Sequence, residues 1–92
     1  MKKLTGEIAS QPTIVTLNSI CSDVMVFVLI KVDNVYKKLF YRDRIPCDLF
    51  SNILVSSVGD KVSVEVTSTS YYGATEIKRF VNHTRGLGVV TI

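Results

Sequence analysis

The chain has 92 residues, of which 47% are hydrophobic, and a formal net charge of +3 at pH 7. This length predicts one domain, and this apolar content excludes global disorder and allows a packed core. Residues 31–44 hold five basic and two acidic residues, a surplus of three that equals the net charge of the whole chain. A localised positive segment favours an anionic partner, although an ordinary solvated surface would explain the same charge.

The sequence carries no clear targeting signal. The residues after the first three are too polar for a secretory signal peptide, and the apolar run Val24–Ile30 is far shorter than the ~20 residues of a membrane helix. Cys21 and Cys47 do not make a disulfide framework. We therefore expect a soluble, cytoplasmic protein without disulfides.

The first predicted element is one long strand over residues 2–17. Gly6 permits a strong bend and Pro12 interrupts regular pairing, so this strand should be bent. Residues 18–23 are mostly polar and predict a loop.

Residues 24–44 predict a β-hairpin that turns at Asp33-Asn34, because both residue types tolerate the left-handed backbone of a tight turn. The strand Val24–Val32 is apolar on both faces and should be central, with its valines and Ile30 towards the core. The strand Val35–Arg44 has two unlike faces, and we place Leu39 and Ile45 inward. A slip of one residue in register would invert this assignment. The outward face then holds Tyr36, Lys38, Phe40, Arg42 and Arg44.

A helix of about three turns is predicted from Asp48, as N-cap, to Gly59, as C-cap. Its apolar stripe consists of Leu49, Phe50, Ile53 and Leu54.

Two more strands follow the helix. Residues 60–69 alternate regularly and predict a strand that turns Val62, Val64 and Val66 inward. Residues 68–73 predict a loop that carries Tyr71 and Tyr72. The last strand is expected over residues 74–82, with Ile77 and Val81 on one face and Phe80 on the other. The domain then covers residues 1–84, and residues 85–92 are a C-terminal tail.

Three strands, one helix and two strands, in that order, resemble the OB-fold, a five-stranded Greek-key barrel with this helix between its third and fourth strands. Thr5-Gly6-Glu7-Ile8 looks like the bent first strand of that family. Val26–Val32 looks like its second strand, and Gly59–Val66 looks like its entry into the fourth. The resemblance covers most of residues 3–83 and implies an all-β fold.

The resemblance also implies a site. OB-folds bind ligands across the outer face of strands two and three, between the loops that here are residues 18–23 and 68–73. Cations that neutralise phosphates and flat side chains that stack on bases suit single-stranded DNA or RNA. The implied function is non-catalytic binding of single-stranded nucleic acid, with homodimer formation as an open possibility. The candidate residues are Lys31, Tyr36, Lys38, Phe40, Arg42, Arg44, Tyr71 and Tyr72.

Other interpretations stay open. The aromatic residues are also compatible with simple packing, and Met25, Phe27 and Leu29 would make a contact patch in a protein-interaction module whose apolar tail adds a strand to a neighbour. Oligosaccharide binding is a third possibility, disfavoured by the lack of a secretion signal. His83 and the cysteines lack metal-ligand spacing, and Gly86-Leu87-Gly88 is not a phosphate-binding loop. We expect no metal, no cofactor, no small-molecule substrate and no enzymatic activity.

Overall fold

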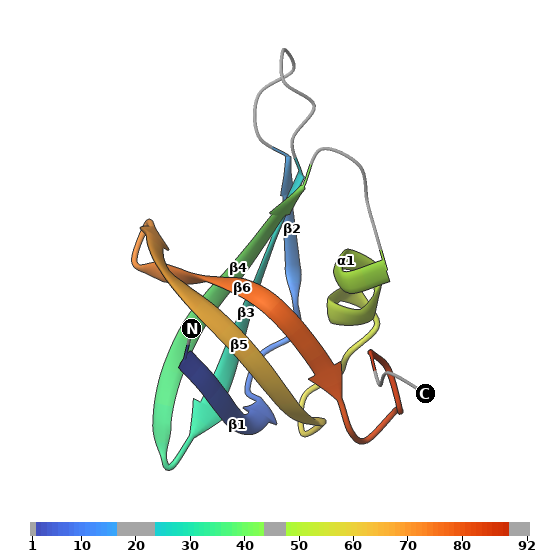
Figure 1. Ribbon diagram of the computed structural model, residues 1–92. Coiled ribbons are helices and arrows are strands. Elements are labelled where there is room, and N and C mark those ends of the chain that lie inside the picture. The colour runs from blue at the N-terminus through green and yellow to red at the C-terminus, as the bar shows by residue number, and fades with distance from the viewer. Residues whose placement is uncertain (1, 17–23, 44–47, 89–92) are drawn as a thin grey trace.

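The computed structural model describes residues 2–16, 24–43 and 48–88, which form six strands and one helix (Figure 1). In chain order these elements are β1 (Lys2–Ile8), β2 (Thr13–Thr16), β3 (Val24–Val32), β4 (Val35–Asp43), α1 (Asp48–Leu54), β5 (Lys61–Tyr71) and β6 (Ala74–Asn82). The predicted hairpin, the start of the helix and the last strand agree closely with these bounds.

The sheet closes on itself into a ring of strands. Its hydrogen-bonded order is β1-β5-β6-β4-β3-β2, and β1 also pairs with β3. Five of these six strand pairings are antiparallel. The sixth, β4–β6, is parallel and places Leu39 opposite Thr75. The chain is therefore mostly β, and one short helix packs on β3, β4 and β6.

β1 joins the two halves of the ring because it has a neighbour on each side. Residues 2–7 pair with residues 61–66 of β5, and its last two residues, Glu7 and Ile8, pair with Lys31 and Ile30 of β3. Gly6 lies just before this crossing. A Cβ atom at Gly6 would lie 2.2 Å from the carbonyl oxygen of Lys31, so only glycine allows this approach.

The prediction of one long first strand is wrong, because residues 9–12 separate β1 from β2. The amide of Ala9 still donates to the carbonyl of Leu29 at 2.8 Å, so the chain stays beside β3. Pro12 has no amide to donate, which fits the break just before β2. β2 then pairs with the other half of β3, from Thr13 opposite Phe27 to Thr16 opposite Val24.

The main core fills the inside of the strand ring. The predicted inward faces are confirmed for β3, for Leu39 of β4 and for the alternating valines of β5. The helix contributes Phe50 and Ile53, with Leu49 and Leu54 packed beside them, so its predicted stripe is also confirmed. Ile45 lies outside the described residues.

The helix is shorter than predicted. α1 has seven residues and ends at Leu54, after which the Ser56 amide donates to the carbonyl of Ile53 and its hydroxyl donates to the carbonyl of Asn52. A serine hydroxyl that competes for helix carbonyls explains this early end. Gly59, predicted as the C-cap, has φ of 92° but lies in the turn into β5, where its amide donates to the carbonyl of Ile8. No helix among the described residues is long and apolar enough to cross a bilayer.

The prediction that Ile77 and Phe80 face opposite sides of the last strand is wrong, because both are buried in the main core. Val66 pairs with Ile77 while the preceding Glu65 pairs with Arg79, so Lys78 is an extra residue in β6. Such a β-bulge reverses the alternation of side chains beyond it.

A buried polar network fastens the start of the predicted tail. Asn82 is fully buried, and its side-chain amide donates to Ser56 Oγ and Asp60 Oδ2, each at 2.9 Å. The guanidinium of Arg85 donates to the same carboxylate at 2.6 Å. The backbone of Leu87 exchanges two hydrogen bonds with that of Asn82. Residues 85–88 are therefore bound to the domain.

Replacing Gly6 by alanine should destabilise the protein by about 1–3 kcal/mol, because the added methyl group must push β1 away from β3. Urea unfolding measures the loss. Lys3→Ala, at an exposed position of the same strand, is the control and should stay within about 0.5 kcal/mol of the wild type. Equal stability of the Gly6 variant and this control would show that the close approach is not needed.

The Asp60 network should make stability depend on pH in the acid range. Hydrogen bonds from the Ser57 amide, Asn82 and Arg85 lower the pKa of Asp60 from 3.8 to about 2. Folding therefore favours the carboxylate, and its contribution is full above the unfolded pKa of 3.8 and lost as pH falls through about 2.

Asp60→Asn tests this contribution by urea unfolding over a pH series. The wild type should be the more stable protein at neutral pH, and the two stability curves should converge between pH 3.8 and about 2. Arg85→Gln should show a weaker pH dependence than the wild type in the same window. Curves for the wild type and Asp60→Asn that stay parallel would contradict the assignment.

Candidate functional site

The outer face of the β3–β4 hairpin consists of side chains that point away from the main core. The hairpin turns at Asp33 and Asn34, whose φ angles of 50° and 65° confirm the predicted left-handed turn. Because the register is fixed by this turn, four pairs of residues lie opposite each other on the outer face. From the turn outward these pairs are Lys31–Tyr36, Leu29–Lys38, Phe27–Phe40 and Met25–Arg42.

An outer apolar cluster covers the middle of this face. It contains Met25, Phe40 and Ala74, all buried, with Phe27 and Tyr71 packed partly exposed against them. It is separate from the main core, so the sheet is apolar on both sides at this point. Burial on the second face explains why β3 is apolar at nearly every position.

Four aromatic side chains form a continuous series across the outer face. The ring centroids of Phe27 and Phe40 are 6.2 Å apart, those of Phe40 and Tyr71 are 5.9 Å apart, and those of Tyr71 and Tyr72 are 4.4 Å apart. All three pairs are tilted or edge-on, which is the favourable geometry for aromatic contacts. The series links the hairpin to the β5–β6 turn.

Phe40 lies on the outer face, as predicted, but it is only 4% exposed. Phe27 and Tyr71 contact its ring from two sides, so it cannot present a flat surface to a ligand in this structure. Phe40 therefore packs beneath the more exposed side chains of Phe27 and Tyr71 and supports them. The sequence could not show this, because the covering Tyr71 comes from a distant strand.

Tyr71 and Tyr72 differ in position. Tyr71 was expected in a loop but is the last residue of β5, and only Tyr72 and Gly73 form the turn before β6. Tyr72 has φ of 50° and is 78% exposed, so its ring is available to solvent. Burial raises the pKa of the Tyr71 phenol, the neighbouring Tyr72 raises it further, and Arg42 opposes the shift.

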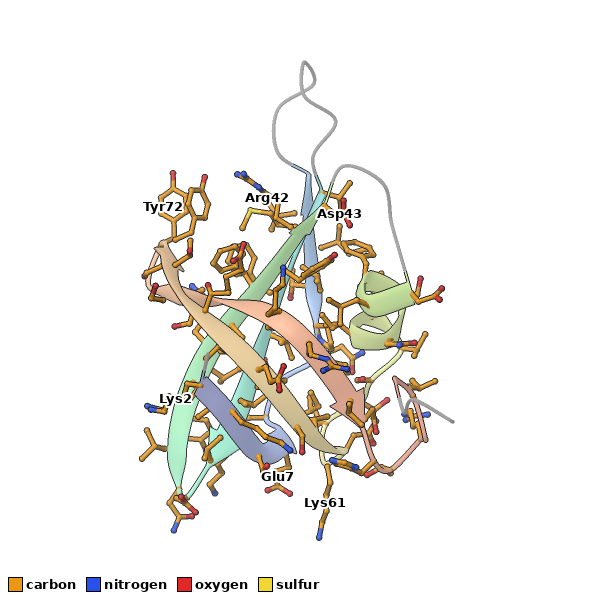
Figure 2. All side chains as sticks on the ribbon, viewed as in Figure 1. Lys2, Glu7, Arg42, Asp43, Lys61 and Tyr72 are labelled. Atoms are coloured by element: carbon orange, nitrogen blue, oxygen red, sulfur yellow. The ribbon has the colours of Figure 1, made fainter. Side chains whose placement is uncertain are left out.

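Cationic side chains flank the aromatic series. Lys38 Nζ lies 5.4 Å from the centre of the Phe27 ring, and Lys31 Nζ lies 5.8 Å from that of Tyr36, both within the range of cation–π contacts. Arg42 is exposed, and Figure 2 shows it at the same end of the molecule as Tyr72, far from Lys61. The predicted face therefore brings together Lys31, Tyr36, Lys38, Phe40, Arg42, Tyr71 and Tyr72.

Two parts of the predicted site, Arg44 and the loop of residues 18–23, lie outside the described residues. Thr13 and Ser10, which no sequence pattern singled out, line a hollow of about 320 Å³ beside Phe27, Leu29 and Lys38. The pairing of β2 with β3 places Thr13 next to the outer face, and the hydrogen bond from the Ala9 amide to the Leu29 carbonyl keeps the chain near Ser10 beside β3.

Burial removes part of the apolar patch that was predicted for a protein-interaction module. Met25 is fully buried beneath the outer cluster, and Phe27 and Leu29 are half-buried. Met25 therefore cannot contact a partner in this structure. Exposed apolar side chains occur instead on β2, where Ile14 is 50% and Val15 is 38% exposed.

Among the described residues, no group of three or more His, Cys, Asp or Glu side chains could hold a metal ion. In comparisons with known proteins, no family model matches the chain, and neither does any curated protein or solved structure.

Proposed function

We propose that this chain is an OB-fold domain that binds single-stranded nucleic acid, DNA or RNA, across the outer face of β3 and β4 and without catalysis. The observation that carries the proposal is the aromatic series Phe27–Phe40–Tyr71–Tyr72 with Lys31, Lys38 and Arg42 beside it on one sheet face. Single-stranded nucleic acid binds surfaces on which cationic side chains, which neutralise phosphates, are interleaved with aromatic side chains, which stack on bases.

The order of the strands supports the OB-fold assignment. With β1 and β2 taken as two halves of one first strand, the ring runs β1-β3-β4-β6-β5 and returns to β1. The first three strands make a meander, the helix follows the third, and the last strand inserts between the third and the fourth with a parallel pairing to the third. This order is the one expected of a Greek-key barrel of the OB type, so it supports the proposal.

The geometry suggests how single-stranded nucleic acid would lie on the outer face. Tyr72 offers an exposed ring at one end of the face and Tyr36, 61% exposed, offers another near the hairpin turn. The buried Phe40 holds Phe27 and Tyr71 between them. Counted from the hairpin turn, Lys31, Lys38 and Arg42 lie in the first, second and fourth cross-strand pairs of the outer face, where they can neutralise phosphates along the bound nucleic acid. Stacking accepts every base, so we expect little sequence preference.

The contribution of the cations can be measured through the salt dependence of binding. Lys38→Gln with Arg42→Gln should weaken the binding of a labelled oligonucleotide. The slope of log K against log salt should become shallower by about 1.4, because each phosphate contact on a single strand contributes about 0.7. Fluorescence anisotropy at several salt concentrations gives both quantities.

The matched control is Lys3→Gln with Lys61→Gln, which removes the same charge from exposed positions on β1 and β5. This control should keep nearly the wild-type slope. If both double variants lower the slope equally, only net charge matters and the site is not on β3 and β4. Unchanged binding in the first double variant would also reject the proposal.

Tyr72→Asn tests stacking separately from charge. Asparagine tolerates the left-handed backbone at this position, so the fold should be kept. Loss of one stacked base, worth about 1–3 kcal/mol, should weaken binding by about 5- to 150-fold with the salt slope unchanged. Val58→Asn, at another exposed apolar position, is the control. Equal affinities of Tyr72→Asn and the wild type would exclude Tyr72 from the site.

A second candidate function, assembly with a protein partner or a second copy of the chain, has one observation in its favour. β2 is an edge of the described sheet and pairs only with β3, and it exposes Ile14 and Val15. Unpaired strand edges accept strands from other chains. Sedimentation of a tight oligomer that ignores oligonucleotides would favour this function over the first.

A further inference from the structure

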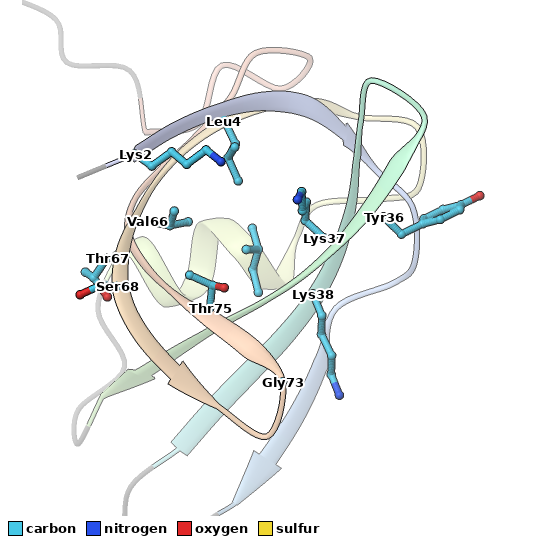
Figure 3. A pocket seen from close by; sticks show the side chains of 11 residues that line it. Lys2, Leu4, Tyr36, Lys37, Lys38, Val66, Thr67, Ser68, Gly73 and Thr75 are labelled. Carbon is cyan, nitrogen blue, oxygen red and sulfur yellow. The ribbon is translucent and has the colours of Figure 1, made fainter.

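One end of the strand ring is open and forms a cavity of about 970 Å³. Its apolar residues are Leu4 of β1, Leu39 of β4 and Val66 of β5, all of which belong to or pack against the main core. Figure 3 looks into this end, with α1 behind the cavity at the other end of the ring. The cavity is therefore an open cup of a size typical for small-molecule sites. Leu39 and Val66 at its base are only 1% and 4% exposed, so Leu4, which is partly exposed, offers most of the surface that these three residues present to a ligand.

Two lysines stand at the opening of this cup. Figure 3 shows Lys2 and Lys37 directed over the cavity, whereas Tyr36 and Lys38 point away from it. Neither Lys2 nor Lys37 forms an ion pair within the described part of the chain. The described residues that line the cavity include no carboxylate. Among the described residues, those that line the opening therefore carry positive charge and no negative charge.

Lys37 is the unusual residue of the two. It is on the inward face of β4, two positions before the buried Leu39, and lies opposite the fully buried Ile30 of β3. An inward-facing ammonium in a half-buried position loses part of its hydration, and an anion at the opening would restore a partner. The alternating pattern of β4 would place an apolar residue here if packing were the only requirement.

We propose that this cavity is a second ligand site, which takes a small amphiphilic anion with an aliphatic chain and a carboxylate or similar head. The chain would contact Leu4 and the aliphatic stems of the two lysines, above the buried Leu39 and Val66, and the head would accept hydrogen bonds from the ammonium groups of Lys2 and Lys37. The Thr75 hydroxyl, also at the cavity, offers a further donor. Tyr36, the one aromatic side chain among the described residues that line the cavity, points away from it, so the interior favours an aliphatic ligand over a nucleotide base.

Sodium decanoate, below its micelle concentration, is the probe. Calorimetry should give saturable 1:1 binding, and affinity should rise with each methylene from hexanoate to decanoate, by at most the roughly fourfold that full burial of a methylene gives. Backbone amide shifts should centre on Leu4, Leu39, Val66 and Thr75. Decyltrimethylammonium, with the same chain and a cationic head, should not bind. The absence of saturable decanoate binding, or shifts centred on the outer face, would overturn the proposal.

Lys37→Gln should weaken decanoate binding about tenfold or more, because it removes a charged donor. Lys2→Gln, at an exposed position near the chain start, is a second variant that should weaken binding even if Lys37→Gln proves unstable. Lys61→Gln, at the other end of β5, is the matched control and should bind like the wild type. Wild-type affinity in both cavity variants would overturn the proposal.

Two further experiments distinguish binding in the cavity from binding to a membrane surface and from binding on the outer face. Vesicles of phosphatidylglycerol should bind less well than free decanoate, and binding to vesicles alone would replace the cavity ligand by a membrane surface. Arg42→Gln should leave decanoate binding unchanged, because Arg42 lies on the outer face and does not line the cavity. Loss of decanoate binding in that variant would show that decanoate does not bind at a site separate from the outer face, whatever the outcome for oligonucleotides.

Discussion

The close approach of β1 to β3 is the constraint on which the rest of the structure depends. β1 pairs with β5 along most of its length and with β3 at its end, and this double pairing turns an open sheet into a ring. The Lys31 carbonyl oxygen occupies the space that a side chain at position 6 would need. Closure by this strand gives the sheet an inside, which the main core fills, and an outside, which is free to carry a site.

The two apolar clusters follow from that separation. The main core lies inside the ring and includes the helix, while the outer cluster of Met25, Phe40 and Ala74 lies on the other side of the same strands. Burying large aromatic side chains on an outer face is not needed to close the ring. It does hold Phe27 and Tyr71 in fixed positions beside the cations, which is the property that a binding surface requires.

Much of the fold was predictable because its signals are local. The Asp33-Asn34 turn fixes the hairpin register, and the alternation of β5 and the stripe of α1 identify their buried faces. The errors occur where distant or competing contacts decide. The break between β1 and β2, the early end of α1 at Ser56 and the bulge at Lys78 depend on pairing partners or on one side-chain hydrogen bond. The outward face of β4 was predicted correctly, but the burial of Phe40 was not.

The sequence by itself determined the elements, the hairpin and the segment that carries the positive charge, because turn residues and side-chain periodicity act over a few neighbours. Only the tertiary structure decided that Tyr71 covers Phe40, that Asp60, Asn82 and Arg85 meet, and that Lys37 stands at the opening of a cavity. These contacts join residues far apart in the chain. Their geometry depends on how the strand ring closes, and no short stretch of sequence contains that information.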